Sequence, residues 1–149
     1  MIVNVDDSIF NVYAQGIVHQ ANCFNTMNSG VAKQIRQLYP EAYEADCKTI
    51  KGDQKKLGTF SFAKGKDGVY IYNCYSQYNY GKVGIFTQYN YLENALWGIK
   101  IHATYRNIRS LAVPYGMGCV RGGGDWKEVS NILSKVFDDD KIMVYICKI

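Results

Sequence analysis

The sequence is poor in the residues that mark metal sites, disulfide frameworks and membrane proteins. It has only two histidines, and its five scattered cysteines include no Cys-x-x-Cys motif, so we expect neither a zinc site nor disulfides. No apolar run is long enough to span a bilayer, and the first residues lack the basic and apolar regions of a signal peptide. We therefore expect a reduced cytoplasmic protein with no metal and no membrane contact.

Strong charge of one sign is also missing. The 17 basic and 13 acidic residues leave a net charge of +4, which is too small to indicate nucleic-acid binding. The lysine-rich stretch from Lys48 to Lys66 is interrupted by Asp53 and by apolar residues, as is typical of a solvated surface. With 48% apolar and 20% charged residues over 149 positions, the chain is not disordered, and we expect one domain spanning 1–149.

Hydrophobic periodicity indicates strands and helices mixed along the whole chain. Val31, Ile35 and Leu38 mark a helix from Gly30 that Pro40 is expected to end. The other predicted helices are 41–48, 91–105 and 125–137, and the predicted strands are 2–5, 16–21, 57–63, 69–75, 111–113 and 142–146. This order predicts an α/β sandwich around a mixed sheet.

Two predicted strands each run through a loop into a helix, one from His19 to Ala32 and the other from Pro114 to Trp126. Free backbone N–H groups and the helix dipole make the start of a helix attractive to phosphate. In open α/β sheets, ligands bind at the edge where strands end. The two loops are therefore the candidate binding elements.

The second loop has five glycines between Gly116 and Gly124, which let backbone amides approach an anion, and Arg121 is available to pair with phosphate. The alternative is a flexible surface loop. The loop matches neither a P-loop nor a dinucleotide fingerprint, and no cysteine has the arginine offset of a cysteine phosphatase. Asp125 precedes the next helix, so an N-cap is favoured over a catalytic role.

The first loop holds His19, Asn22 and Asn25. His19 lies within an apolar strand, where a histidine is often a satisfied core residue, yet it is close to the strand's exit and can equally serve a site. The asparagines can hydrogen-bond a ribose or a carbonyl, or can stabilise turns of their own loop.

Together these loops resemble the macro domain family, which binds ADP-ribose, over nearly the whole chain. The resemblance is strongest to the branch with the ADP-ribose 1″-phosphate phosphatases and the terminal ADP-ribose protein glycohydrolase. It rests on four segments in the family's order: Asp6-Asp7-Ser8-Ile9, His19, Met27-Asn28-Ser29-Gly30-Val31-Ala32, and Gly116-Met117-Gly118 followed by Trp126-Lys127-Glu128-Val129. It implies a three-layer α/β/α fold with a central mixed β-sheet.

The resemblance also implies the site. Asp7 would accept a hydrogen bond from adenine, the loop from Gly116 to Arg121 would wrap the diphosphate, and the loop from Asn22 to Ala32 would hold the distal ribose. Catalytic roles fall to His19 and Asn22. The implied ADP-ribose-binding residues are Asp7, Ser8, Ile9, Ala21, Asn22, Cys23, Asn28, Ser29, Gly30, Val31, Ala32, Gln77, Tyr115, Gly116, Met117, Gly118, Cys119, Val120 and Arg121.

Two departures from the family bear on the reaction. The glycohydrolase uses a lysine where this chain has Gln77, and an aspartate near the position of Val120. Glutamine cannot form a covalent sugar adduct and valine cannot act as a base. The phosphatase members also lack the lysine, so hydrolysis of ADP-ribose 1″-phosphate is the leading hypothesis.

Three alternatives remain open at this point: a module that binds ADP-ribose without turnover, a hydrolase that removes ADP-ribose from macromolecules without a lysine, and an unrelated small α/β protein. The expected partner is ADP-ribose or ADP-ribose 1″-phosphate, bound by a monomer without a cofactor. A viral source is compatible with such a domain, and the location would then be the host cytoplasm.

Overall fold

The computed structural model describes residues 1–79, 87–119 and 123–148. Its elements follow in the order β1 (Ile2–Val5), β2 (Gly16–Asn22), α1 (Gly30–Leu38), α2 (Pro40–Cys47), the 3-10 helix η1 (Gln54–Lys56), β3 (Phe60–Lys64), β4 (Tyr70–Gln77), α3 (Tyr89–Tyr105), β5 (Ser110–Pro114), α4 (Trp126–Val136) and β6 (Met143–Cys147). The strands form a six-stranded sheet in the order β1-β6-β5-β2-β4-β3. All neighbours are parallel except β3 and β4, so the predicted mixed sheet is confirmed.

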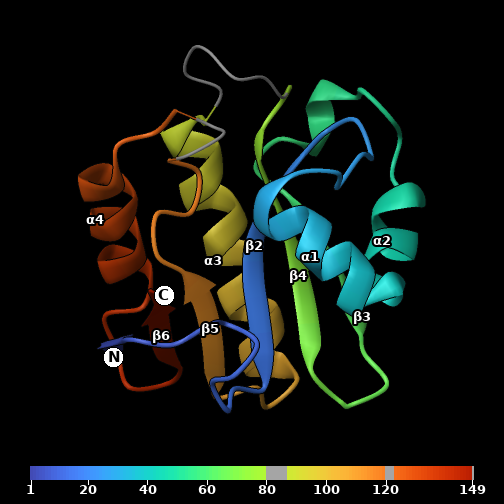
Figure 1. The fold of residues 1–149 in the computed structure, drawn as a ribbon. Coiled ribbons are helices and arrows are strands. Elements are labelled where there is room, and N and C mark those ends of the chain that lie inside the picture. Colours follow the sequence, from blue (N-terminus) through green and yellow to red (C-terminus); the bar gives the residue numbers. More distant parts are fainter. Residues whose placement is uncertain (80–86, 120–122, 149) are drawn as a thin grey trace.

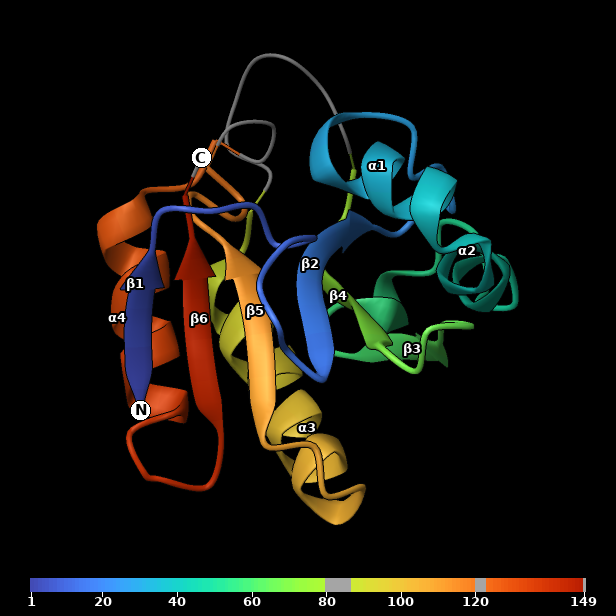
Figure 2. The same cartoon turned by 60° about the horizontal axis from the view of Figure 1, so that its bottom comes forward.

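The sheet lies between two helical layers, with α1 and α2 on one face and α3 and α4 on the other (Figures 1 and 2). Alternate residues of β2 show this division, because Ile17 packs in the core with Ile35 of α1, and Val18 packs in the core with Leu96 of α3 and Leu133 of α4. Both faces of the central strands are therefore buried, as parallel strands require. The predicted three-layer α/β/α fold is confirmed.

Several element boundaries differ from the sequence prediction in ways that matter for the site. Pro40 does not simply end the first helix but begins α2 directly after Tyr39, because its fixed φ and missing N–H suit a first helical position. Strand β4 continues past Tyr75 to Gln77, where it pairs with Asn22 across an irregularity in β2. This extension brings the side chains of two separate segments to one edge of the sheet.

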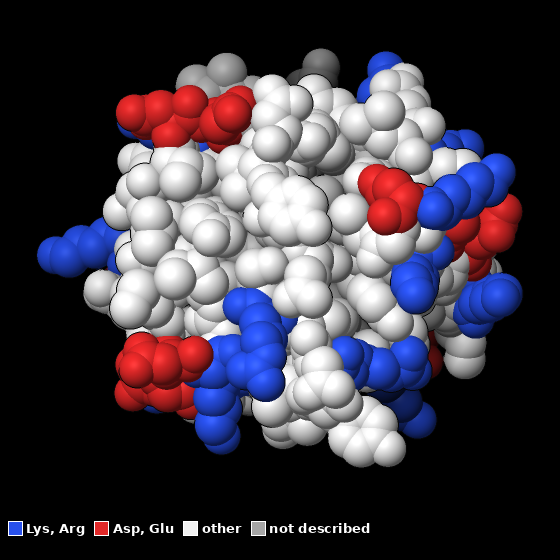
Figure 3. Space-filling view, turned by 90° about the horizontal axis from the view of Figure 1, so that it is seen from below, with Lys and Arg blue, Asp and Glu red and all other residues white. Residues whose placement is uncertain are grey.

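The surface mixes charges of both signs. On the face seen from below, basic and acidic groups are interspersed around a largely uncharged centre (Figure 3). Lys48, Lys51 and Lys55, within the lysine-rich stretch, are exposed. None of the helices in the described part of the chain is long and apolar enough to cross a membrane.

Candidate functional site

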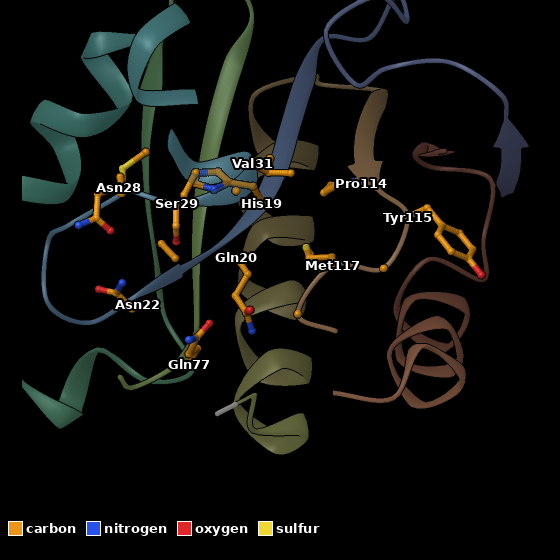
Figure 4. A pocket seen from close by; sticks show the side chains of 16 residues that line it. His19, Gln20, Asn22, Asn28, Ser29, Val31, Gln77, Pro114, Tyr115 and Met117 are labelled. Atoms are coloured by element: carbon orange, nitrogen blue, oxygen red, sulfur yellow. The ribbon is translucent and has the colours of Figure 1, made fainter. Parts of the chain in front are cut away.

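The site lies where two neighbouring strands send the chain to opposite faces of the sheet. Strand β2 leads into α1 and α2 on one face, whereas its neighbour β5 leads into α4 on the other. Such a switch point leaves a crevice beyond the carboxyl ends of the strands. A cavity of about 420 Å³ is found there (Figure 4). This volume lies within the range of small-molecule sites.

Most residues predicted for the site line this cavity, and three further residues were missed. The predicted residues that line it are His19, Ala21, Asn22, Asn28, Ser29, Gly30, Val31, Ala32, Gln77, Tyr115, Gly116, Met117 and Gly118. Gln20, Met27 and Pro114 complete the lining. All three lie within the two loops that the sequence indicated as binding elements, so their place in those loops was the signal in the sequence.

Other predicted residues lie elsewhere. Asp7 and Ser8 line a second cavity, of about 430 Å³, together with Asp6, Asn11 and Lys148. The Lys148 ammonium lies 4.6 Å from the centre of the Tyr115 ring, and Tyr115 lines the first cavity. The two cavities therefore adjoin at this pair. Ile9 and Cys23 are buried, Cys119 is not in either lining, and the predictions for Val120 and Arg121 fall outside the described residues.

His19 is fully buried beneath the cavity. Its Nε2 lies 2.7 Å from the Asn73 side-chain oxygen, and because the Asn73 amide nitrogen donates to the Ala42 carbonyl, that oxygen accepts and Nε2 carries the proton. Burial lowers the pKa of His19 to about 4, so the ring is neutral at pH 7. Its Nδ1 makes no well-formed hydrogen bond within the described structure and keeps a lone pair.

Asn22 and Gln77 lie together at one end of the cavity, far from Tyr115 (Figure 4). The Asn22 oxygen accepts from the amide of Phe24 at 2.8 Å, and its nitrogen donates to the Thr26 hydroxyl at 2.7 Å. The predicted turn-stabilising role of Asn22 is thus present. The buried Gln77 stands beside it as a neutral amide that can donate and accept hydrogen bonds.

The start of α1 and the end of the loop that leads into it line the same cavity with backbone amides that have no partner within the helix. Ser29 is the N-cap of α1 but its side chain makes no capping bond, and the cavity is lined by Gly30, Val31 and Ala32 of the first turn. The first N–H groups of a helix have no partner within the helix and carry its positive dipole end. This wall can therefore bind an anion.

The glycine loop forms the facing wall. Gly116 and Gly118 have φ values of 76° and 78°, a left-handed conformation that glycine adopts without a side-chain clash. Next along the chain, Asp125 caps α4 by accepting from the amide of Lys127 at 3.0 Å, so the predicted cap is confirmed. The loop is thereby anchored at its helix end.

No charged side chain stands among the described residues that line the cavity. The polar groups of the lining are backbone amides, the side-chain amides of Gln20, Asn22, Asn28 and Gln77, and the neutral ring of His19. Such a lining suits an anionic ligand with hydroxyl groups. It offers no carboxylate base and no amine nucleophile.

Comparison with known proteins places this fold and cavity in a family. The model of the Macro domain family matches residues 18–133, which span both strand-exit loops. The chain therefore belongs to the macro domain family, as the sequence resemblance predicted.

Individual relatives agree with this placement. A 17.5 kDa protein from the tk-vs intergenic region of Enterobacteria phage T4 is 31% identical over 137 residues, covering 89% of this chain and 88% of the relative. A DNA ADP-ribosyl glycohydrolase of Mycobacterium tuberculosis is 26% identical over 140 residues, but the match covers only 39% of that protein. The chain thus resembles one part of the glycohydrolase.

Solved structures share the fold. The macrodomain of Thermus aquaticus DarG superposes with a TM-score of 0.84 at 22% identity, covering 100% of this chain and 99% of that one. Thermosipho africanus DarTG, solved in complex with ADP-ribose, gives a TM-score of 0.79 at 20% identity, with 99% of this chain and 41% of that one covered.

Proposed function

We propose that the cavity binds ADP-ribose and that the protein hydrolyses ADP-ribose 1″-phosphate to ADP-ribose and phosphate. The observation that carries the proposal is the pairing of two amide-rich walls, from α1 and from the glycine loop, around a cavity lined by uncharged side chains. Membership of the macro domain family supports ADP-ribose as the ligand.

Each part of the ligand can be assigned to one part of the cavity lining. Asn22 and Gln77 would bind hydroxyls of the distal ribose, and the first amides of α1 would bind the phosphate on its C1″ carbon. The glycine loop would bind the diphosphate. The second cavity beyond Tyr115 would receive the adenine, with Asp7 accepting from its amine.

An uncharged site suits a leaving group that departs as a stable anion. When the substrate phosphate is a monoanion, breaking the C1″–O bond releases HPO4²⁻, and water adds to the oxocarbenium-like carbon and gives its proton to that phosphate. The amides of α1 would stabilise the charge that develops on the phosphate. His19 is neutral, and its Nδ1 is buried in the ligand-free structure, so it would accept a hydrogen bond from the attacking water only where ligand binding uncovers the ring. This role is orientation of water rather than donation of a proton.

Removal of ADP-ribose from DNA is the second candidate, supported by the names of the relatives in Thermus aquaticus and Mycobacterium. A nucleobase is a poorer leaving group than phosphate and gains more from a proton donor, which the described lining does not supply. We therefore place it second. The phage T4 relative supports a setting in the cytoplasm of an infected host.

Purified protein is tested with ADP-ribose 1″-phosphate, ADP-ribosylated DNA and ADP-ribosylated protein, with product release followed by chromatography. We expect phosphate release, reduced at least tenfold by Asn22→Ala and unchanged by Asn131→Ala, an exposed asparagine of α4. His19→Ala releasing phosphate at the wild-type rate would exclude His19 from catalysis. Label from ¹⁸O-water found in the phosphate would refute C1″–O cleavage.

The remaining outcomes separate the alternatives. ADP-ribose binding by calorimetry without release from any substrate would assign a binding module. Release from DNA or protein without phosphate release would assign the macromolecular hydrolase. Absence of both binding and turnover would overturn the proposal.

A further inference from the structure

A buried lysine lies behind the wall that carries Asn22. Lys56, the last residue of η1, is 7% exposed. Its Nζ donates to the Cys23 carbonyl at 3.0 Å and to the Asn25 side-chain oxygen at 2.7 Å. The same nitrogen lies 4.8 Å from the centre of the Tyr75 ring. Two hydrogen bonds and one aromatic face thus surround the ammonium group, and it has no place in the cavity lining.

A buried carboxyl accompanies the lysine. Asp46 of α2 is fully buried and accepts a hydrogen bond of 2.5 Å from the Tyr75 hydroxyl. Burial lowers the pKa of Lys56, and the carboxylates of Asp46 and Asp53 raise it in part. The lowered pKa means that the charged form is less favourable in the folded protein than in water. Its two hydrogen bonds and the Tyr75 ring offset this cost in part.

The wall that Lys56 contacts has a strained backbone. Asn25 and Met27 have φ values of 58° and 42°. Asparagine adopts this region more readily than most residues, but it costs Met27 about 1–2 kcal/mol. The wall also begins at the irregularity between Ala21 and Asn22. Such a conformation persists only where surrounding contacts fix it.

Those contacts come largely from the segment that ends at Lys56. The Asn25 amide nitrogen donates to the Thr49 carbonyl at 3.1 Å, and the Gly52 amide donates to the Cys23 carbonyl at 2.6 Å. Arg36 of α1 adds a bond to the Thr26 carbonyl. Lys56 adds a second positive charge to this set. It contacts Cys23 and Asn25, which lie within the turn that Asn22 closes with Thr26.

We infer that Lys56 is a positioning residue for the ADP-ribose site: by binding the Cys23 carbonyl and the Asn25 side chain it holds the strained wall in the shape that directs Asn22 into the cavity. The inference rests on the proposed function for its ligand. It predicts that loss of the ammonium group alters the wall and weakens ADP-ribose binding while the fold is kept.

The test compares Lys56→Met with two lysine controls. Lys55→Met removes the exposed neighbour in η1. Lys100→Met removes the other buried lysine, which bonds the Val136 carbonyl and Asp139 on a different part of the molecule. We expect calorimetry to show about tenfold weaker ADP-ribose binding for Lys56→Met and no such loss for the two controls. Lys100→Met should lower the Tm but keep the affinity within twofold of the wild type.

A double-mutant cycle separates positioning from general packing. Asn25→Gly tolerates the positive φ but removes the oxygen that Lys56 binds. We expect Lys56→Met to weaken binding far less in the Asn25→Gly background than in the wild type. Additive losses would overturn the inference. Lys56→Gln replaces Lys56→Met in the cycle should the latter fail to fold.

Hydrogen exchange of the ligand-free proteins keeps this inference distinct from the proposed function. We expect the amides of Cys23 and Gly52 to exchange at least tenfold faster in Lys56→Met than in Lys55→Met. Equal exchange and equal affinity in these two variants would refute the positioning role. A further outcome is that the amides exchange faster in Lys56→Met although the wild type does not bind ADP-ribose. That result would refute the proposed function and leave Lys56 as an anchor of the wall alone.

Discussion

The hydroxyl of Thr87 donates a hydrogen bond of 2.6 Å to the carbonyl of Gly118, and it accepts one of 3.1 Å from the side chain of Gln20. Thr87 lies just before α3 and is almost fully buried. It thereby links the exit of β2 to the glycine loop after β5. This chain of bonds ties the glycine wall to β2 beside the cavity.

We expect Thr87→Val to weaken ADP-ribose binding by about five- to tenfold, because the valine removes two hydrogen bonds at a cost of about 1 kcal/mol. The Gly118 carbonyl keeps only its bond from the Gly124 amide, and the Gln20 amide keeps only its bond to the Ser76 hydroxyl. Calorimetry checks the affinity. Thr104→Val, at an exposed position of α3, is the control and should bind normally. Equal affinities for the two variants would show that the link does not shape the cavity.

Gly118→Ala tests the close packing of the glycine loop. An added Cβ would lie 3.0 Å from the Thr87 hydroxyl and 3.1 Å from the Gln20 amide nitrogen. Gly68→Ala has a similarly positive φ but open space around it, so it carries the backbone cost of about 1 kcal/mol alone. We expect Gly118→Ala to lower the free energy of unfolding more than Gly68→Ala, and to be the only one of the two that weakens binding. Urea unfolding and calorimetry measure the two effects.

Acid should destabilise the fold through His19. Its pKa is about 4 in the folded protein and 6.5 in its ordinary state, so the unfolded chain binds more protons between these values. Stability is therefore lost as the pH falls from 6.5 toward 4, by up to about 3 kcal/mol from this residue. Asp46, whose pKa is raised by burial, contributes with the opposite sign.

Urea unfolding of the wild type and of His19→Gln at pH 7.5 and pH 4.5 isolates the histidine. The loss of stability on acidification should be smaller in the variant, because glutamine does not titrate. A variant with the same pH dependence as the wild type would place the titration elsewhere.

The uncharged lining leads to a prediction for Gln77. Gln77→Glu keeps the size of the side chain but adds a negative charge beside the proposed phosphate site. We expect it to weaken binding of ADP-ribose 1″-phosphate more than binding of ADP-ribose, because the extra phosphate is repelled. Competition calorimetry compares the two ligands, with the exposed Gln54→Glu as the control. An equal change for both ligands would place the terminal phosphate away from Gln77.

Local patterns in the sequence were sufficient for the elements and for most of the cavity. Val31 and Ile35 mark α1, and the run of Leu111, Ala112 and Val113 marks β5, because burial imposes such patterns directly. Leu38, expected on the same face of α1, is instead 59% exposed. The motifs around Asn28 and Gly116 located both walls because strand-loop-helix units place their loops at one edge of a sheet. The details that depend on neighbouring strands were harder to predict. The end of β4 at Gln77 follows from its pairing with β2, and no residue near Gln77 encodes it.

The sequence by itself determined the family, the layered α/β architecture and the two loops that face each other, because these follow from periodicity and from motifs within short segments. Only the tertiary structure decided that His19 is a neutral, buried ring fixed by Asn73, that Asp7 belongs to a second cavity, and that Lys56 is buried against Cys23 and Asn25. Each of these depends on residues far apart in the chain that meet in the interior. Burial and pairing there set protonation and position, and these are properties that composition and spacing do not contain.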